Sequence, residues 1–124
     1  MLVIKVDPEN IYNTIQVKEI ESGLHNYYKE IGCNTIDIQS RFIGKKLYDF
    51  IVDDDFLSKR NKLKPSASNV VGNDLFFGTV LICNFDENTG EEKSLTKEYI
   101  EIILNNSCEF VSDKGLKTKG ILFS

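Results

Sequence analysis

The polar residues of a predicted irregular loop, Ser58–Asn73, have the side chains of a site for a phosphate-bearing ligand. Lysine and arginine bind phosphate through charge-assisted hydrogen bonds, hydroxyl and amide groups complete the contacts, and a nearby aromatic ring stacks on a base. Arg60 is the strongest single candidate, because a guanidinium grips phosphate through two parallel hydrogen bonds. The predicted ligand-binding residues are Arg60, Lys62, Lys64, Ser66, Asn73, Phe56 and Phe77.

The formal charge of the chain, −4 at pH 7, is unevenly distributed. The segment from Arg41 to Lys64 holds seven basic and four acidic residues and carries +3, which leaves −7 on the remainder. A positive patch on an acidic body favours a compact anionic partner over duplex nucleic acid, which the acidic body would repel. Two alternatives remain: lysines that only keep a loop solvated, and a protein-directed inhibitor that uses the acidic surface.

Other residue groups give no catalytic, metal or cofactor prediction. Asp53-Asp54-Asp55 could place two carboxylates on one side of an extended chain for a cation, but a strand-ending turn explains three aspartates equally well. His25 is the only histidine, and no sequence feature brings it near Cys33, Cys83 or Cys108 as a catalytic base. No phosphate-binding or dinucleotide glycine motif occurs. We therefore predict a protein that is not an enzyme.

The apolar runs predict a single α+β domain, in which two helices pack on a mainly antiparallel sheet. Leu75–Cys83 is almost continuously apolar, so it is predicted as the central strand, buried on both faces, with Val80 and Ile82 in the core. The strand Lys46–Val52 precedes the acidic turn. These two strands bracket the polar loop and must position it.

Two helices and a C-terminal segment complete the predicted organisation. The first helix is expected over Lys18–Ile31, because apolar residues recur there at helical spacing and Gly32 follows as a closing residue. The second begins after Thr96, a good N-cap. Residues 1–106 are predicted as the α+β domain, and residues 107–124 as either a terminal hairpin or a loosely attached tail.

Size and composition set the remaining expectations. The length of 124 residues suits one domain, and no window approaches the ~18 apolar residues that span a bilayer. Three widely spaced cysteines without a ligand pattern favour reduced thiols in the cytoplasm. The many aromatic residues predict an exposed apolar patch and, through it, a homodimer; they are Phe42, Tyr48, Phe50, Phe56, Phe76, Phe77, Phe110 and Phe123.

Several short segments resemble the DUF3846 family over about residues 4–104. They are the strand and acidic turn Tyr48–Asp54, then Lys64–Ala67, Gly72–Ile82, and Gly90–Thr96 before the last helix. The resemblance transfers no catalytic residue. It implies a small accessory protein of bacteriophages or mobile elements, working in the cytoplasm of a bacterial host. Such proteins counter host defence by sequestering a nucleotide immune signal or by blocking a defence protein.

Charge and resemblance together predict a non-enzymatic function. The chain is expected to bind and sequester a small anionic ligand of nucleotide type, and inhibition of a host defence protein is the alternative. No cofactor, metal, membrane or duplex nucleic acid is expected as a partner.

Overall fold

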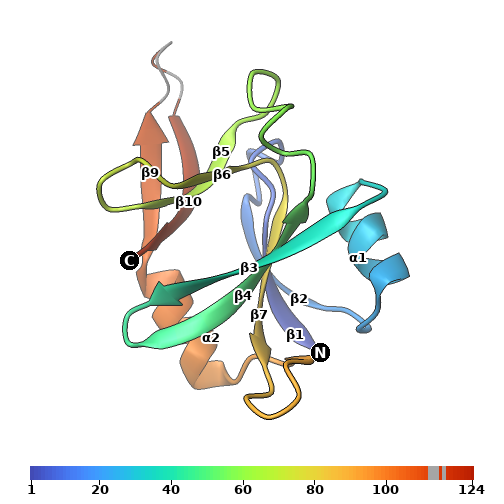
Figure 1. Ribbon diagram of the computed structural model, residues 1–124. Coiled ribbons are helices and arrows are strands. Elements are labelled where there is room, and N and C mark those ends of the chain that lie inside the picture. Colours follow the sequence, from blue (N-terminus) through green and yellow to red (C-terminus); the bar gives the residue numbers. More distant parts are fainter. Residues whose placement is uncertain (112–114, 116) are drawn as a thin grey trace.

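The computed structural model describes residues 1–111, 115 and 117–124, which form two β-sheets and two helices (Figure 1). The first sheet has the strand order β2-β1-β7-β4-β3, with the short β8 paired to β7, and each pair is antiparallel. Its strands are β1 (Leu2–Val6), β2 (Ile15–Glu19), β3 (Ile36–Ile43), β4 (Lys46–Asp53), β7 (Val80–Phe85) and β8 (Glu92–Lys93).

The second sheet has the order β6-β5-β10-β9, and only the pairing of β5 with β10 is parallel. Its strands are β5 (Pro65–Asn69), β6 (Leu75–Phe77), β9 (Ser107–Val111) and β10 (Lys117–Phe123). The α+β class and the mainly antiparallel pairing are therefore confirmed. Within residues 107–124, β9 and β10 pair with each other, and Ile121 and Phe123 of β10 are buried in the main core.

Strand β7 lies at the centre of the first sheet, between β1 and β4. Four successive residues from Val80 to Cys83 are fully buried, as predicted for a strand that is covered on both faces. Ile82 points into the larger core cluster, between the sheets, whereas Leu81 and Cys83 belong to a smaller cluster that includes Tyr27 of the first helix.

The predicted continuous strand Leu75–Cys83 is wrong, because the chain changes sheets at Gly78. Strand β6 ends at Phe77 in the second sheet, and β7 begins at Val80 in the first. Gly78 has a φ of +81°, a conformation that glycine adopts without the strain a side chain would cause. Its N–H donates to the carbonyl oxygen of Lys64 at 2.9 Å, which ties the crossing point to the start of β5.

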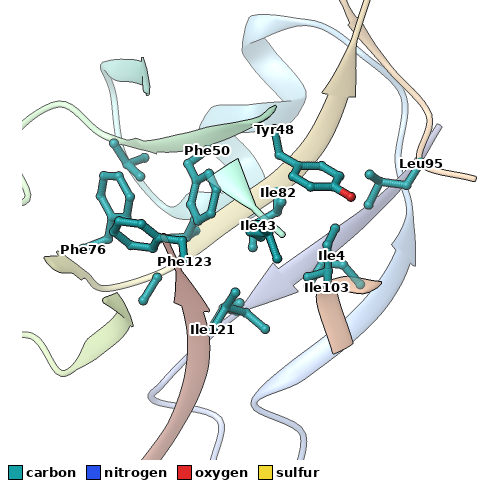
Figure 2. Packing of buried hydrophobic residues seen from close by; sticks show 14 of the residues in the cluster. Ile4, Ile43, Tyr48, Phe50, Phe76, Ile82, Leu95, Ile103, Ile121 and Phe123 are labelled. Carbon is teal, nitrogen blue, oxygen red and sulfur yellow. The ribbon is translucent and has the colours of Figure 1, made fainter. Parts of the chain in front are cut away.

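Aromatic rings fill the space between the two sheets (Figure 2). Phe50 of β4 stacks on Phe76 of β6 at 5.3 Å between ring centroids, and Phe123 of β10 lies 5.7 Å from both. Phe56 approaches Phe76 at 5.5 Å. Of the eight aromatic residues from which an exposed patch was expected, these four and Tyr48 are buried and cannot belong to it. Phe42 remains half exposed, and the homodimer stays a prediction.

The first helix, α1 (Leu24–Ile31), is shorter than predicted. Lys18 lies in β2, and the helix begins only after Gly23, whose φ of 129° is not helical. Its end is confirmed: Gly32 is left-handed and its N–H donates to the carbonyl of Tyr28.

The second helix, α2 (Lys97–Asn105), begins as predicted. Thr96 is its N-cap, and the Thr96 hydroxyl oxygen accepts a hydrogen bond from the N–H of Tyr99 at 3.2 Å. Ile103 of α2 is fully buried in the main core. In the described part of the chain, neither helix has the length and apolar character needed to cross a membrane.

One carboxyl group is buried on β4. Asp49 is 7% exposed, and its Oδ1 accepts a hydrogen bond from the Ser40 hydroxyl at 2.9 Å. Burial raises the pKa of Asp49, and the nearby Glu92 carboxylate raises it further, whereas Ser40 and Lys46 oppose the shift. The folded state therefore binds this proton more tightly than the unfolded chain.

Replacing Ile82 with alanine should lower the free energy of unfolding by about 2–5 kcal/mol, because the substitution leaves a cavity between the sheets. Val17→Ala, on the half-exposed edge strand β2, is the control and should cost no more than about 0.5 kcal/mol. Urea denaturation of both variants measures the difference. An Ile82→Ala protein as stable as the unmodified chain would contradict the central position of β7.

Asp49→Asn should stabilise the fold at pH 7. Because the folded pKa of Asp49 is raised, its contribution to stability is fully present below the unfolded pKa and is lost as pH rises through the folded pKa. The variant avoids that loss, so its gain in melting temperature should be larger at pH 7 than at pH 4. Asp54→Asn, on an exposed side chain, is the matched control. A gain that is equal at both pH values would exclude ionisation of Asp49 as the cause.

Candidate functional site

The structure does not bring the predicted ligand-binding residues together. Ser66 is fully buried in β5, where its hydroxyl donates to the carbonyl of Phe76 at 3.2 Å. Phe56 is 5% exposed and packs on Phe76, while Phe77 is half-buried against the main core. A ligand cannot contact Ser66 or stack on Phe56 in this conformation, so these two assignments are corrected.

The remaining predicted residues lie at opposite ends of β5. Arg60 and Lys62 are exposed in the turns before it, and Lys64 lies 3.8 Å from a carboxylate oxygen of Glu9. Asn73 lies beyond the other end, where its side-chain oxygen accepts a hydrogen bond from Asn69. A strand of five residues spans about 16 Å. The predicted irregular loop therefore contains a strand that separates its basic part from its amide part.

The acidic turn is occupied by contacts of its own. Asp53 accepts a hydrogen bond from the N–H of Asp55 at 2.9 Å, and its other oxygen lies 2.7 Å from the ammonium of Lys59. Across the described residues, no group of three or more acidic, histidine or cysteine side chains is arranged to hold a metal ion. His25 is exposed on α1, as expected for a surface histidine.

A different pocket, of about 380 Å³, lies between the β7–β8 turn and the start of α2, at the lower end of the molecule in Figure 1. Ligand pockets usually exceed about 300 Å³, so the size fits a small molecule. The lining combines two lysines, two aromatic rings, two acids and four neutral polar residues. They are Lys46, Lys93, Phe85, Tyr99, Asp86, Glu87, Asn84, Asn88, Ser94 and Thr96.

Three aromatic rings hold the ammonium group of Lys46. Its Nζ lies 4.8 Å from the ring centroid of Tyr99, 5.4 Å from that of Tyr48 and 5.5 Å from that of Phe85. Each distance is within the range of a cation–π interaction. Burial raises the pKa of Tyr48 to about 12, so this ring carries a neutral phenol at physiological pH. We name these four residues the lysine cage.

The two lysines of the pocket lie near carboxylates but form no direct ion pair: Asp49 interacts with Lys46, and Asp86 with Lys93, only at longer range. Neither Lys46 nor Lys93 forms an ion pair within residues 1–111, 115 and 117–124. By contrast, the ammonium groups of Lys5 and Lys18 share the carboxylate of Glu30 at 3.1 and 2.7 Å. The lysines of the pocket are therefore available to an anion.

Asn84 is a largely buried polar residue in the pocket lining. It is only 3% exposed, and its Oδ1 accepts a hydrogen bond from the N–H of Phe85 at 2.9 Å. Among the described residues, the fully buried side-chain atoms without a hydrogen-bond partner are the hydroxyls of Tyr27 and Tyr48, and the Asn84 amide is not one of them. Thr96 adds the N-terminal end of α2, whose dipole also favours an anion.

The two acids of the pocket lie in the β7–β8 turn, near Lys93 of β8. Asp86 accepts hydrogen bonds from the N–H groups of Asn88 and Thr89 at 2.8 and 3.0 Å. These bonds lower the pKa of Asp86, so its carboxylate is ionised at neutral pH. Glu87 is exposed beside it. The pocket thus presents both donors and acceptors.

Sequence reasoning missed this pocket for an identifiable reason. Lys46 belongs to the basic segment but lies in a predicted strand, and the sequence predicts no binding role for Lys93. Lys46 lies in β4, 38 residues before the next residue of the lining, Asn84, so no short sequence motif contains the whole pocket.

Residues 1–107 match the model of a family described as "Domain of unknown function (DUF3846)". Neither the curated proteins nor the solved structures contain a match to this chain. The matched region includes the whole pocket between the β7–β8 turn and α2.

Proposed function

The chain belongs to the DUF3846 family, and we propose that it binds a small anionic ligand of nucleotide type in the pocket beside the lysine cage. One observation carries the proposal: two lysines line one pocket of suitable size, and neither forms an ion pair within the described residues. Charge-assisted hydrogen bonds from such donors are the usual means of holding phosphate.

In this proposal the protein acts by sequestration and not by catalysis. It is an accessory protein of a phage or mobile element, in the cytoplasm of the bacterial host, and it counters host defence by lowering the free concentration of a nucleotide immune signal. The family resemblance suggests this role. The positions of Arg60 and Lys62, exposed and outside the pocket, make them the alternative basic site.

Calorimetry with paired variants distinguishes the two basic sites. The probes are cyclic dinucleotides, cyclic trinucleotides and cyclic ADP-ribose isomers. Lys46→Gln combined with Lys93→Gln should weaken binding of the preferred probe at least ten-fold, because it removes both charges from the pocket. Arg60→Gln combined with Lys62→Gln removes two charges outside the pocket. This variant should bind the probe with an affinity within about two-fold of the unmodified protein, because only the long-range attraction between these charges and the anionic probe is lost.

The melting temperature of both double variants serves as the control for folding. Loss of binding only in the Arg60 and Lys62 variant would move the site back to the basic loop. Absence of binding to every probe by the unmodified protein would refute the proposed function.

A second candidate function, inhibition of a host defence protein, is favoured by the turn between β5 and β6. Val70 and Val71 are 76% and 80% exposed there, although β-branched residues are poor turn formers. The turn is nevertheless well ordered by hydrogen bonds. The Asn69 side-chain oxygen accepts from three successive N–H groups, those of Gly72, Asn73 and Asp74, at 2.9 to 3.2 Å.

Arg41 fixes this turn to the core. Its guanidinium contacts the Asp74 carboxylate at 2.8 and 3.4 Å and lies over the rings of Phe76 and Phe123. The turn thus holds two aliphatic side chains toward solvent. Side chains fixed in this way could insert into an apolar pocket of a partner protein and anchor the complex.

Val70→Ser combined with Val71→Ser should abolish a protein-directed function while it preserves ligand binding and the melting temperature. A host protein that co-purifies with the unmodified chain is identified, purified and titrated against both forms. Affinity at least ten-fold lower for the variant supports this function. Equal affinity would exclude the turn as the anchor.

A further inference from the structure

We infer that the edge strand β2 is an interface through which two copies of this chain pair, strand against strand, to form a homodimer. The pairing would join the first sheets of both copies into one continuous sheet, because β2 is the outermost strand of that sheet. The interface does not depend on the pocket beside the lysine cage or on its ligand. The argument starts from the backbone groups that each edge strand leaves unpaired.

Three residues of β2 turn their backbone groups away from the sheet. In an antiparallel pair, residues that bond to the neighbouring strand alternate with residues whose N–H and C=O point away from it. The even-numbered residues of β2 face β1, because Thr14 accepts from the N–H of Asp7 and Ile20 exchanges both backbone bonds with Met1. In the described part of the chain, the backbone groups that point away have no hydrogen-bond partner. They belong to Ile15, Val17 and Glu19.

The opposite edge of the same sheet, β3, is closed by the chain itself. The N–H of Ile38 donates to a carboxylate oxygen of Asp37 at 3.0 Å, and the guanidinium of Arg41 donates to the carbonyl of Ser40 at 2.9 Å. The carbonyl of Phe42 accepts from the N–H of the C-terminal residue at 2.8 Å. Proteins protect an edge strand from pairing by occupying it in such ways. Strand β3 is therefore blocked, whereas β2 is open.

The remaining edge strands suit a second copy less well. Strand β9 is the outer strand of the second sheet, and its odd-numbered residues point away from β10. A full pairing of two β9 strands would be centred on Glu109 and would place two carboxylates opposite each other, which destabilises a sheet. Strands β6 and β8 have only three and two residues.

A second copy of β2 satisfies all the open groups in one antiparallel register. With the two-fold axis at Val17, Val17 lies opposite Val17 of the second copy, and Ile15 lies opposite Glu19. Registers centred on Lys18 or on Glu19 place like charges directly opposite each other. A register centred on Gln16 leaves Glu19 beyond the end of the partner strand. Charge and hydrogen bonding therefore select the register centred on Val17.

The side chains of β2 are compatible with this register. Val17 is 47% exposed, so it can cover Val17 of the second copy without leaving a core of its own. Lys18 would lie opposite Gln16, and its ammonium is already paired with Glu30 at 2.7 Å. No charged side chain of β2 then faces a like charge directly across the pair.

Exposed apolar side chains at both ends of β2 extend the contact. A specific interface buries more than about 1,000 Å² in total, and a pair of five-residue strands alone is smaller. Ile11 and Tyr12 are 68% and 94% exposed in the turn before β2, and Leu24 is 57% exposed shortly after it. Antiparallel pairing brings the turn before β2 of one copy to the same end of the interface as Leu24 of the other.

Light scattering from micromolar to submillimolar protein measures the self-association. We expect the mass to rise from that of one chain toward that of two. Val17→Lys should raise the dissociation constant at least about five-fold, because it places two ammonium groups opposite each other at the centre of the pair. Val111→Lys adds the same charge to the exposed edge strand β9 and is the matched control, which should leave self-association unchanged. The melting temperatures of both variants confirm that they are folded.

Oxidative cross-linking tests the register. The two copies of residue 17 should have Cα atoms about 5.5 Å apart, a distance that a disulfide spans, so Val17→Cys should form a covalent dimer. Glu19→Cys is the control and should not, because the two copies of residue 19 are offset by four residues, about 13 Å along the strands. The unmodified chain, in which Cys33 and Cys108 are partly exposed, gives the background.

The outcomes that contradict the interface are specific. A mass of one chain at every concentration would overturn the inference, and so would self-association that Val17→Lys leaves unchanged. Cross-linking through residue 19 and not through residue 17 would overturn the pairing centred on Val17. None of these results bears on ligand binding in the pocket, so the proposed function is tested separately.

Discussion

The packing of Phe50, Phe76 and Phe123 is the contact on which the rest of the fold depends, because these rings join the two sheets (Figure 2). Each ring comes from a different strand, and aromatic side chains bury more apolar area than any others. Arg41 covers the outer side of this cluster and at the same time holds Asp74 of the β5–β6 turn. The core and the exposed turn are therefore stabilised by the same side chain.

The last strand of the chain completes this arrangement. Strand β10 lies between β5 and β9 and brings Ile121 and Phe123 into the main core, although the family match ends at residue 107. Gly120 of β10 is needed for its close packing: a Cβ at this position would lie 2.4 Å from the carbonyl oxygen of Ser66 and 2.2 Å from the Phe110 ring. In this protein the second sheet is thus built from residues on both sides of the family boundary.

The sequence predicted the elements whose signals are local. Strand β7 is apolar at every position except Asn84, and α2 follows a threonine whose hydroxyl caps it, so both elements can be predicted from short stretches. Strand β5 cannot, because Pro65–Asn69 has no apolar alternation and its burial comes from pairing with β6 and β10. Because that strand is not recognisable, residues 58–73 are predicted as one long loop. The predicted binding site therefore combines residues that β5 separates in the structure.

The lysine cage could not be predicted for a related reason: its rings come from β4, β7 and α2, which only the fold brings together. The cage also decides what Lys46 is suited for. A half-buried ammonium loses part of its hydration and needs other contacts in its place. For Lys5 this contact is an ion pair with the carboxylate of Glu30. Aromatic faces stabilise a cation without adding a negative charge. Lys46 therefore contributes its charge to the pocket without an ion pair among the described residues, although the buried carboxyl group of Asp49 balances part of that charge at longer range.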